Sequence, residues 1–173
     1  MKVSIITVSY NSAKTIGDTI SSVQKQTYEN IEYIVVDGLS TDGTSEIVKQ
    51  YLDSSKDVSQ DASQDSAKGL VSKFLCAKDK GIYDAMNKGL ALATGDIIGV
   101  LNSDDFYCSN DVIENVVRAF QKNETDCLYG DLNYVDPIDT NKILRKWRSG
   151  SYNKENFLKG WMPPHPTFFV KKS

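Results

Sequence analysis

The sequence predicts an α/β fold in which a mostly parallel sheet carries helices on both faces. Over the first 130 residues, short apolar runs alternate with segments whose apolar residues recur at helical spacing. This alternation is typical of a parallel sheet covered on both sides. A polar cluster follows each of the first four runs, as expected where parallel strands end at one edge and form a ligand site.

The individual elements follow from the spacing of apolar residues. Runs rich in Val and Ile predict strands, and apolar residues three or four positions apart predict helices. In chain order we expect a strand over 3–8, a helix over 15–25, a strand over 31–36, a helix over 44–52, a strand over 70–76, a helix over 82–93, a strand over 97–101, a helix over 111–122 and a strand over 127–130.

The helix over 82–93 has one apolar face. Met86, Leu90 and Ala93 lie on this face, which we expect to be buried, and Gly95 is expected to stop the helix. Residues 53–68 are rich in Ser, Asp, Gln and Lys. They cannot supply a core face, so we expect a mobile loop without a function.

The pattern changes beyond Gly130. Residues 132–135 and 142–147 predict a β-hairpin, and 149–159 predicts a short helix. The β-rich run 167–170 has no evident partner, so we expect it to be loosely held.

Composition restricts the class of protein. The net charge of −3 disfavours a nucleic-acid partner. Three cysteines and one histidine lack the spacing of zinc ligands, and the odd cysteine count fits a reducing compartment where cysteines act as small apolar residues. We see no secretory leader and no apolar stretch of the ~20 residues that span a membrane. The expected location is therefore cytoplasmic.

Two adjacent acids, Asp104 and Asp105, follow the apolar run 97–101, separated from it only by Asn102 and Ser103. The carboxyl end of a buried strand is where ligands of open α/β sheets bind. Paired carboxylates repel each other unless a cation lies between them, and Mg²⁺ and Mn²⁺ take oxygen ligands that often include substrate phosphates. The pair indicates a metal-diphosphate site, although taken alone a polar turn would be the favoured explanation.

Other strand ends carry further candidates. Asp37 can accept a hydrogen bond from a base or a ribose, but an Asx-turn explains it equally well. Tyr10 can stack on a base or pack at the sheet edge, and Asp42 is better explained by a turn and helix cap. His165, the only histidine, lies among prolines and could coordinate the metal or contact a diphosphate.

Five motifs occur in a fixed order that resembles a known family. They are Ser9-Tyr10-Asn11, Asp37-Gly38-x-Ser40-x-Asp42-Gly43-Thr44, the run from Asp79 to Gly89, Thr94-Gly95-Asp96, and Asn102-Ser103-Asp104-Asp105. Together they resemble the family 2 glycosyltransferases of the Rossmann-like GT-A fold. The resemblance implies transfer of a sugar, with inversion, from a nucleotide-diphospho-sugar, and a UDP-sugar is the expected donor. The acceptor would be a glycan or a lipid-linked molecule in polysaccharide biosynthesis. A lipid-linked acceptor would place the protein at the inner face of the membrane.

The resemblance also implies the roles of individual residues. The nucleotide-binding set would be Val8, Tyr10, Asp37, Asp79 and Asp104. A Mn²⁺ or Mg²⁺ cofactor would be held by Asp105, with Asp104 on the ribose or on metal-bound water. His165 stays a further candidate ligand because of its own setting, independently of the resemblance. Asn102 stands where the family often has its first acid, and its carbonyl oxygen can still accept.

The resemblance finally implies a division of the chain and a missing group. Residues 1–130 would form the nucleotide-sugar-binding core, and 131–173 a partial acceptor-side segment. The family's catalytic base follows the part that resembles 165–169, so we expect it beyond Ser173, with Asp131 the nearest candidate inside the chain. We therefore expect the nucleotide-binding part of a longer enzyme. A catalytically incomplete nucleotide-sugar-binding module is the alternative, and a nucleotidyltransferase is disfavoured because no Gly-rich phosphate loop follows the first strand.

Overall fold

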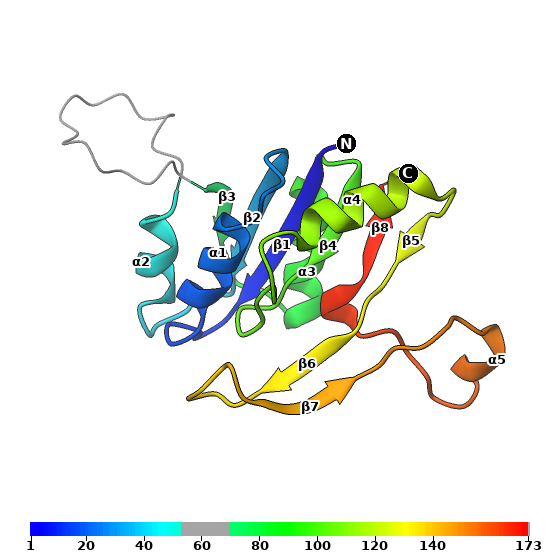
Figure 1. Cartoon of the computed structure of the whole chain (residues 1–173). Coiled ribbons are helices and arrows are strands. Elements are labelled where there is room, and N and C mark those ends of the chain that lie inside the picture. Colours follow the sequence, from blue (N-terminus) through cyan, green and yellow to red (C-terminus); the bar gives the residue numbers. More distant parts are fainter. Residues whose placement is uncertain (53–69, 173) are drawn as a thin grey trace.

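Six strands of the described chain, residues 1–52 and 70–172 of the computed structural model, form one central sheet (Figure 1). Across the sheet they are β3 (Val71–Cys76), β2 (Ile31–Asp37), β1 (Val3–Ser9), β4 (Ile97–Val100), β8 (Phe169–Lys171) and β5 (Cys127–Leu128). β1 to β4 pair in parallel, whereas β8 runs antiparallel to β4 and to β5. The mostly parallel sheet confirms the predicted fold class.

The register of the parallel strands brings their carboxyl ends to one edge of the sheet. Ser9, the last residue of β1, pairs with Asp37, the last residue of β2, and Asp37 pairs with Cys76 at the end of β3. On the other side of β1, Ile6 pairs with Val100 at the end of β4. The polar clusters that follow these four strands therefore share an edge, as the sequence predicted.

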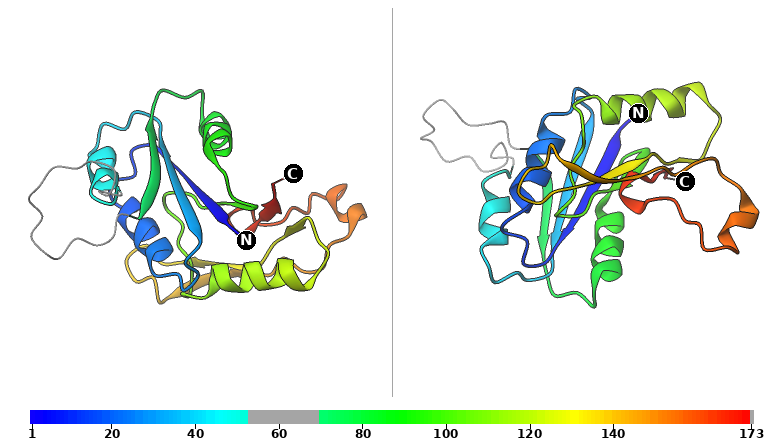
Figure 2. Two further views of the ribbon diagram at one scale, coloured as in Figure 1. Left: turned by 90° about the horizontal axis from the view of Figure 1, so that it is seen from above. Right: turned by 60° about the horizontal axis from the view of Figure 1, so that its bottom comes forward.

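Helices cover both faces of the sheet (Figure 2). α1 (Ile16–Gln24) and α4 (Val112–Lys122) lie on one face, together with α2 (Thr44–Lys49), and α3 (Ile82–Leu92) lies on the other. Because successive strand residues point to opposite faces, Ile5 packs in the cluster with α1 and α4, and Ile6 packs beneath α3. Burial of such a side chain contributes about 1.5–3 kcal/mol, and burial on both faces explains why these strands are mostly apolar.

The buried stripe of α3 differs from the predicted one. Ala85 and Gly89 face the sheet, and a Cβ at Gly89 would lie only 2.4 Å from Cγ2 of Ile6. Leu90, which was expected in the core, is 38% exposed, and Met86 is partly buried at the margin of the core. The prediction for Leu90 was wrong because the helix backbone approaches β1 too closely for large side chains to fit between them.

The run expected to be loosely held is instead a strand inside the central sheet. Phe169 of β8 is 3% exposed, and its ring lies against Gly99 of β4, where a Cβ would be 2.4 Å from Cε1. Val170 pairs with Ile98 on one side and with Cys127 on the other. The expectation was wrong because both partners of β8 are distant in the sequence, where no local pattern reveals them.

Composition also led to expectations about the cysteines, about membrane-spanning helices and about residues 53–68. The cysteines were expected to serve as small apolar residues, but Cys76, Cys108 and Cys127 are all exposed because they lie at a strand end, in a loop and in an outer strand. Among the residues that the structure describes, no helix is both long enough and apolar enough to cross a membrane. The loop predicted over 53–68 lies outside the described residues.

Residues 131–164 leave the central sheet and form what we call the arm. The predicted hairpin is present as β6 (Leu132–Val135) and β7 (Ile143–Trp147), which pair antiparallel. The arm continues through α5 (Lys154–Phe157), and η2 (His165–Thr167) returns the chain to β8. Figure 1 shows the arm apart from the sheet, on the side toward which the parallel strands point.

Candidate functional site

Hydrogen bonds tie the loops after β1 and β2 to each other at the carboxyl edge. Oγ of Ser40 accepts from the Asn11 N–H at 2.8 Å, and Oδ1 of Asn11 accepts from the Thr41 N–H at 2.9 Å. Oγ1 of Thr44 accepts from the Ser12 N–H at 2.8 Å. Asn11 has a φ of 51°, a left-handed conformation that Asn tolerates better than most residues. These bonds fix the edge that carries the candidate residues.

Asp37 is fully buried, and its own chain occupies its carboxylate. Oδ1 accepts from Oγ of Ser9 at 2.9 Å and from Oγ of Ser40 at 2.6 Å. Oδ2 accepts from the Ser40 N–H at 2.9 Å and from Oγ of Ser45 at 3.0 Å. Burial acts to raise the pKa of this carboxyl, but the donors, led by Ser40, outweigh burial and hold the pKa below its ordinary value. Of the two roles that the sequence left open, this geometry favours the turn.

Tyr10, Gly38 and Asp79 meet at the ends of β1, β2 and β3. A Cβ on Gly38 would lie 2.5 Å from Oδ2 of Asp79 and 3.3 Å from Cδ2 of Tyr10. The Tyr10 side chain is 67% exposed, whereas the Val8 side chain is buried in the core and is not available to a ligand. This end of the edge offers an aromatic ring beside a carboxylate, an arrangement that suits a nucleoside base because bases stack on aromatic rings.

Asn102 brings His165 and Asp105 together beyond the end of β4. Its Nδ2 donates to Oδ2 of Asp105 at 3.0 Å and lies 3.0 Å from Nε2 of His165, which is 63 residues away in the chain. Asp104 is exposed next to this cluster. Burial, with a further contribution from the charge of Asp104, raises the pKa of Asp105. Two of the residues predicted to bind a metal, Asp105 and His165, therefore meet at Asn102, with Asp104 next to Asp105 in the chain.

This group has the chemistry of a site for a hard divalent cation. Oδ1 of Asn102 is buried and has no hydrogen-bond partner in the described chain. Leaving such an acceptor unsatisfied costs about 1–3 kcal/mol, and a cation would remove that cost. Within residues 1–52 and 70–172, no three His, Cys, Asp or Glu side chains are grouped to hold an ion by themselves. An ion here would need Asn102 or the oxygens of a bound diphosphate to complete its ligands.

Ser12 and Ser103 connect the two ends of the edge. Their Oγ atoms lie 2.8 Å apart, and Ser103 is buried. Ser12 follows β1 and Ser103 follows β4, the neighbouring strands whose ends carry Tyr10 and Asn102. This hydrogen bond therefore links the two loops that carry the candidate residues.

Asp131, the candidate base within the chain, is engaged by its neighbours in the arm. Its Oδ2 accepts from Nη1 of Arg148 at 2.6 Å, and its Oδ1 accepts from the Ser149 N–H at 2.9 Å. Arg148 in the first place, and then Ser149, lower the pKa of Asp131. A carboxylate in this state is a weak proton acceptor.

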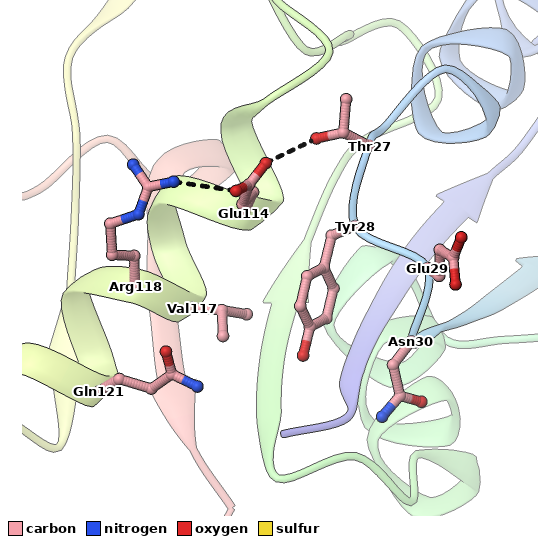
Figure 3. Close-up of a pocket in the computed structure, with 8 residues that line it drawn as sticks. All are labelled: Thr27, Tyr28, Glu29, Asn30, Glu114, Val117, Arg118 and Gln121. Atoms are coloured by element: carbon pink, nitrogen blue, oxygen red, sulfur yellow. Dashed lines mark hydrogen bonds and ion pairs between the residues drawn. The ribbon is translucent and has the colours of Figure 1, made fainter.

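A shallow hollow of about 490 Å³ lies at the opposite end of the strands (Figure 3). Asn30, which immediately precedes β2, lines it, as does Tyr28, whose hydroxyl donates to the Met1 carbonyl. Glu114 in its wall is already engaged by Thr27 and Arg118. None of the residues predicted from the sequence lines this hollow, so we do not assign the site to it.

The structure adds Gly38, Ser12 and Ser103 to the predicted set. All three lie within or next to the motifs noted in the sequence, but their roles depend on contacts between loops that are distant in the chain. The signal available for Gly38 was its position directly after a strand, because glycine there often marks a close approach of another group.

Comparison with known proteins gives consistent matches. The model of the family described as "Glycosyl transferase family 2" matches residues 4–170. The UDP-Glc:alpha-D-GlcNAc-diphosphoundecaprenol beta-1,3-glucosyltransferase WfgD of Escherichia coli is 36% identical over 155 residues, which cover 88% of this chain and 54% of the relative. The chain spans 38% to 54% of the length of the curated relatives that it matches.

Solved structures support the same assignment. The crystal structure of Staphylococcus aureus TarS 1-349 in complex with UDP-GlcNAc is 25% identical, with a TM-score of 0.61, over 75% of this chain and 34% of that chain. The mannosyltransferase PcManGT from Pyrobaculum calidifontis, solved with GDP-Man and Mn²⁺, is 23% identical with a TM-score of 0.62, over 81% of this chain and 37% of that chain, a likeness that bears on the fold alone. The fold is that of the GT-A glycosyltransferases, and the chain belongs to glycosyl transferase family 2.

Proposed function

We propose that this chain binds a nucleotide-diphospho-sugar, with a UDP-sugar the favoured donor, and that it serves in transfer of the sugar with inversion to a glycan or lipid-linked acceptor. The observation that carries the proposal is that two chemically different groups of residues share one edge of the sheet, on loops joined by Ser12 and Ser103. An exposed aromatic ring and a carboxylate lie at one end of the edge, and Asn102, Asp105 and His165 lie at the other. A base at the first end and a diphosphate at the second match the two chemically different parts of such a donor.

Different residues would bind different parts of the donor. Tyr10 would carry the base on its ring, Asp79 would accept a hydrogen bond from it, and Asp104 would bind the ribose. Asp105, His165 and Asn102 would hold a Mg²⁺ or Mn²⁺ ion, with Asp104 close by. When bound, such an ion supplies positive charge that stabilises the departing diphosphate.

Transfer also requires a group that accepts the proton of the attacking hydroxyl. We assign no such base among the described residues, because Arg148 and Ser149 already engage the carboxylate of Asp131. This engagement favours the second candidate function, a nucleotide-sugar-binding module that does not complete transfer by itself. General-base help contributes ~10²–10⁴-fold to a rate, so donor binding without measurable transfer is the expected behaviour of such a module.

A lipid-linked acceptor is the favoured class, and it would bring the protein to the inner face of a membrane. The proposal draws on the name of the E. coli relative, which specifies a diphosphoundecaprenol acceptor. The arm supports it as well, because it carries six Lys or Arg and four Asp or Glu in a chain whose net charge is −3. A net positive surface is attracted to anionic lipids.

Calorimetric titration of the chain with UDP tests the proposal. Affinity should be higher with Mn²⁺ or Mg²⁺ than with a chelator, and Asp105→Ala should remove that difference. Asp126→Ala is the control, because Asp126 is exposed and distant from the site in the fold. Equal affinity of the unaltered chain with and without the ion would refute the metal-assisted site. Sugar transfer to simple acceptors by this chain would decide against the binding-module alternative.

A further inference from the structure

Gly38 occupies the point where the ends of three parallel strands converge. Its N–H donates to the Ser9 carbonyl at 2.9 Å, which extends the pairing of β1 and β2 by one step. A Cβ on Gly38 would lie 2.5 Å from Oδ2 of Asp79, a distance that real Cβ contacts do not reach, and 3.3 Å from the Tyr10 ring. Gly38 is not among the glycines with a positive φ, so the position requires glycine for space and not for backbone conformation.

The Asp79 carboxylate that lies over Gly38 has one fixed oxygen and one available oxygen. Oδ1 accepts from the Gly81 N–H at 2.9 Å, which orients the group. No hydrogen-bond donor of the described chain reaches Oδ2, and the side chain is only half-buried. Oδ2 is therefore a single, directed acceptor beside the exposed ring of Tyr10.

In Asp37, the neighbouring carboxylate, both oxygens already accept hydrogen bonds from the chain. Its two oxygens accept five hydrogen bonds, from Ser9, Ser40, Ser45 and Cys76. A ligand would have to displace one of these donors to reach it, and the side chain is fully buried. Of the two carboxylates at this end of the site, Asp79 is the one that a ligand can use.

We infer that Gly38 determines the base specificity of the site by admitting Asp79, whose Oδ2 selects bases that carry a ring N–H. This inference rests on the proposed function and makes the donor class more specific. A base on the Tyr10 ring would turn its hydrogen-bonding edge toward Oδ2. Uracil presents a ring N–H there, which a carboxylate accepts, whereas the ring nitrogen of cytosine carries a lone pair that the carboxylate repels. Guanine and adenine differ in the same way.

The relative affinities of UDP and CDP, measured by calorimetry in the presence of Mn²⁺, test the inference. The unaltered chain should prefer UDP by about tenfold, the effect of one hydrogen bond replaced by an unpaired acceptor. In Asp79→Asn the amide can donate to the ring nitrogen of cytosine, so the UDP:CDP preference should fall to about one or reverse.

Gly38→Ala and Gly17→Ala form a matched pair of variants. The first should displace Asp79 and remove the preference, because the new Cβ takes the place of the carboxylate. The second should keep the preference, because nothing lies within 4 Å of a Cβ on Gly17. If Gly38→Ala does not fold by circular dichroism, Asp79→Asn still decides the matter, since it changes one atom and adds no volume.

The outcomes separate this inference from the proposed function. Equal binding of UDP and CDP by the unaltered chain, or an unchanged preference in a folded Asp79→Asn variant, would overturn the inference and leave the proposed function standing. Failure of every nucleotide to bind in the presence of Mn²⁺ would overturn both.

Discussion

The body, meaning the central sheet with α1 to α4, and the arm are both built around strands, but different forces hold them. All seven residues of β1 are buried, whereas four of the five residues of β7 are exposed. Neighbouring strands and helices on two faces surround each central strand of the body, while β6 and β7 have only each other. Two-stranded hairpins are marginal in water, so the arm needs additional contacts along its length.

Those contacts in the arm are specific and pairwise. Arg148 bridges to Asp131, and the Trp161 Nε1–H donates to the Ser149 carbonyl at 2.9 Å. Arg145 lies over the rings of Tyr134 and Trp147. Edge-to-face aromatic contacts centred on Trp161 connect Tyr129, Tyr152 and Phe157. The comparison indicates that burial stabilises the body, whereas exposed polar and aromatic pairs, each worth little on its own, shape the arm.

The largest expected difference concerns two phenylalanines. Phe169→Ala removes a ring that packs on Gly99 in the body, and should lower the free energy of unfolding by about 3–5 kcal/mol. Phe157→Ala, at a side chain 48% exposed in the arm, should cost less than about 1 kcal/mol in the same urea denaturation experiment. Similar losses of unfolding free energy in the two variants would contradict the proposed difference between the body and the arm.

The second prediction concerns Glu32, a buried acid of β2. It accepts from Oγ of Ser4 at 2.6 Å, the Thr94 N–H at 2.7 Å and Nζ of Lys73 at 2.9 Å. Burial acts to raise its pKa, but these partners outweigh burial and hold the pKa well below its usual value. Glu32→Gln should therefore cost about 1.5–3 kcal/mol at neutral pH, the range for hydrogen bonds to a charged group.

The pH dependence checks this assignment. A depressed folded-state pKa gives stability that is fully present above the usual pKa of 4.5 and is lost as the pH falls below that value. The unaltered chain should therefore lose more stability than Glu32→Gln between pH 5 and about pH 3. Glu124→Gln, at an exposed position, should follow the unaltered chain. Parallel curves for Glu32→Gln and the unaltered chain would show that the ionised Glu32 is not a stabilising group.

A third comparison uses two aspartates that both accept from serines. Asp37→Asn leaves buried donors without their charged partner and should cost about 1–3 kcal/mol. Asp131→Asn, in the exposed arm, should leave the melting temperature of the body almost unchanged. Differential scanning calorimetry measures both. If Asp37→Asn melts normally but loses nucleotide affinity, Asp37 contacts the ligand and our assignment to the turn is wrong.

The smallest expected effect is at the tip of the hairpin. Ile138 is 95% exposed, so Ile138→Ser should change the free energy of unfolding by less than about 0.5 kcal/mol. A larger loss in urea denaturation would mean that the hairpin tip is buried in solution and that the arm is not as exposed as described.

The sequence predicted the body better than its connections. The strands of the body are recognisable because burial on both faces makes them apolar, and the strand ends revealed the polar clusters because chain direction sets the edge where they meet. The packing of α3 was not predictable, since only the close approach of Gly89 to Ile6 shows why Leu90 points outward. The run 167–170 was recognised as β-rich, but its place in the sheet was not predictable, because the partners of β8 are distant in the chain.

In the candidate site, too, some features could be predicted from the sequence and others could not. Asp104, Asp105 and Tyr10 were identified from their positions after strands, and His165 from its setting among prolines. The saturation of Asp37 by serines was not predictable, because an Asp before a turn looks the same whether its carboxylate is free or occupied. The close approach of Asp79 and Tyr10 to Gly38 depends on how three loops converge, which local sequence does not encode.

The insertion of β8 between β4 and β5 has a consequence for the order in which the molecule assembles. β1 to β4 come from the first part of the chain and can pair as soon as those segments exist. Asn102 can meet His165 only after β8 has joined the sheet, because His165 belongs to η2, the short helix just before that strand. Contacts between distant parts of a chain form slowly. In refolding, the end of the candidate site at Tyr10 should therefore form early, and the end at Asn102 should wait for the last strand to enter the sheet.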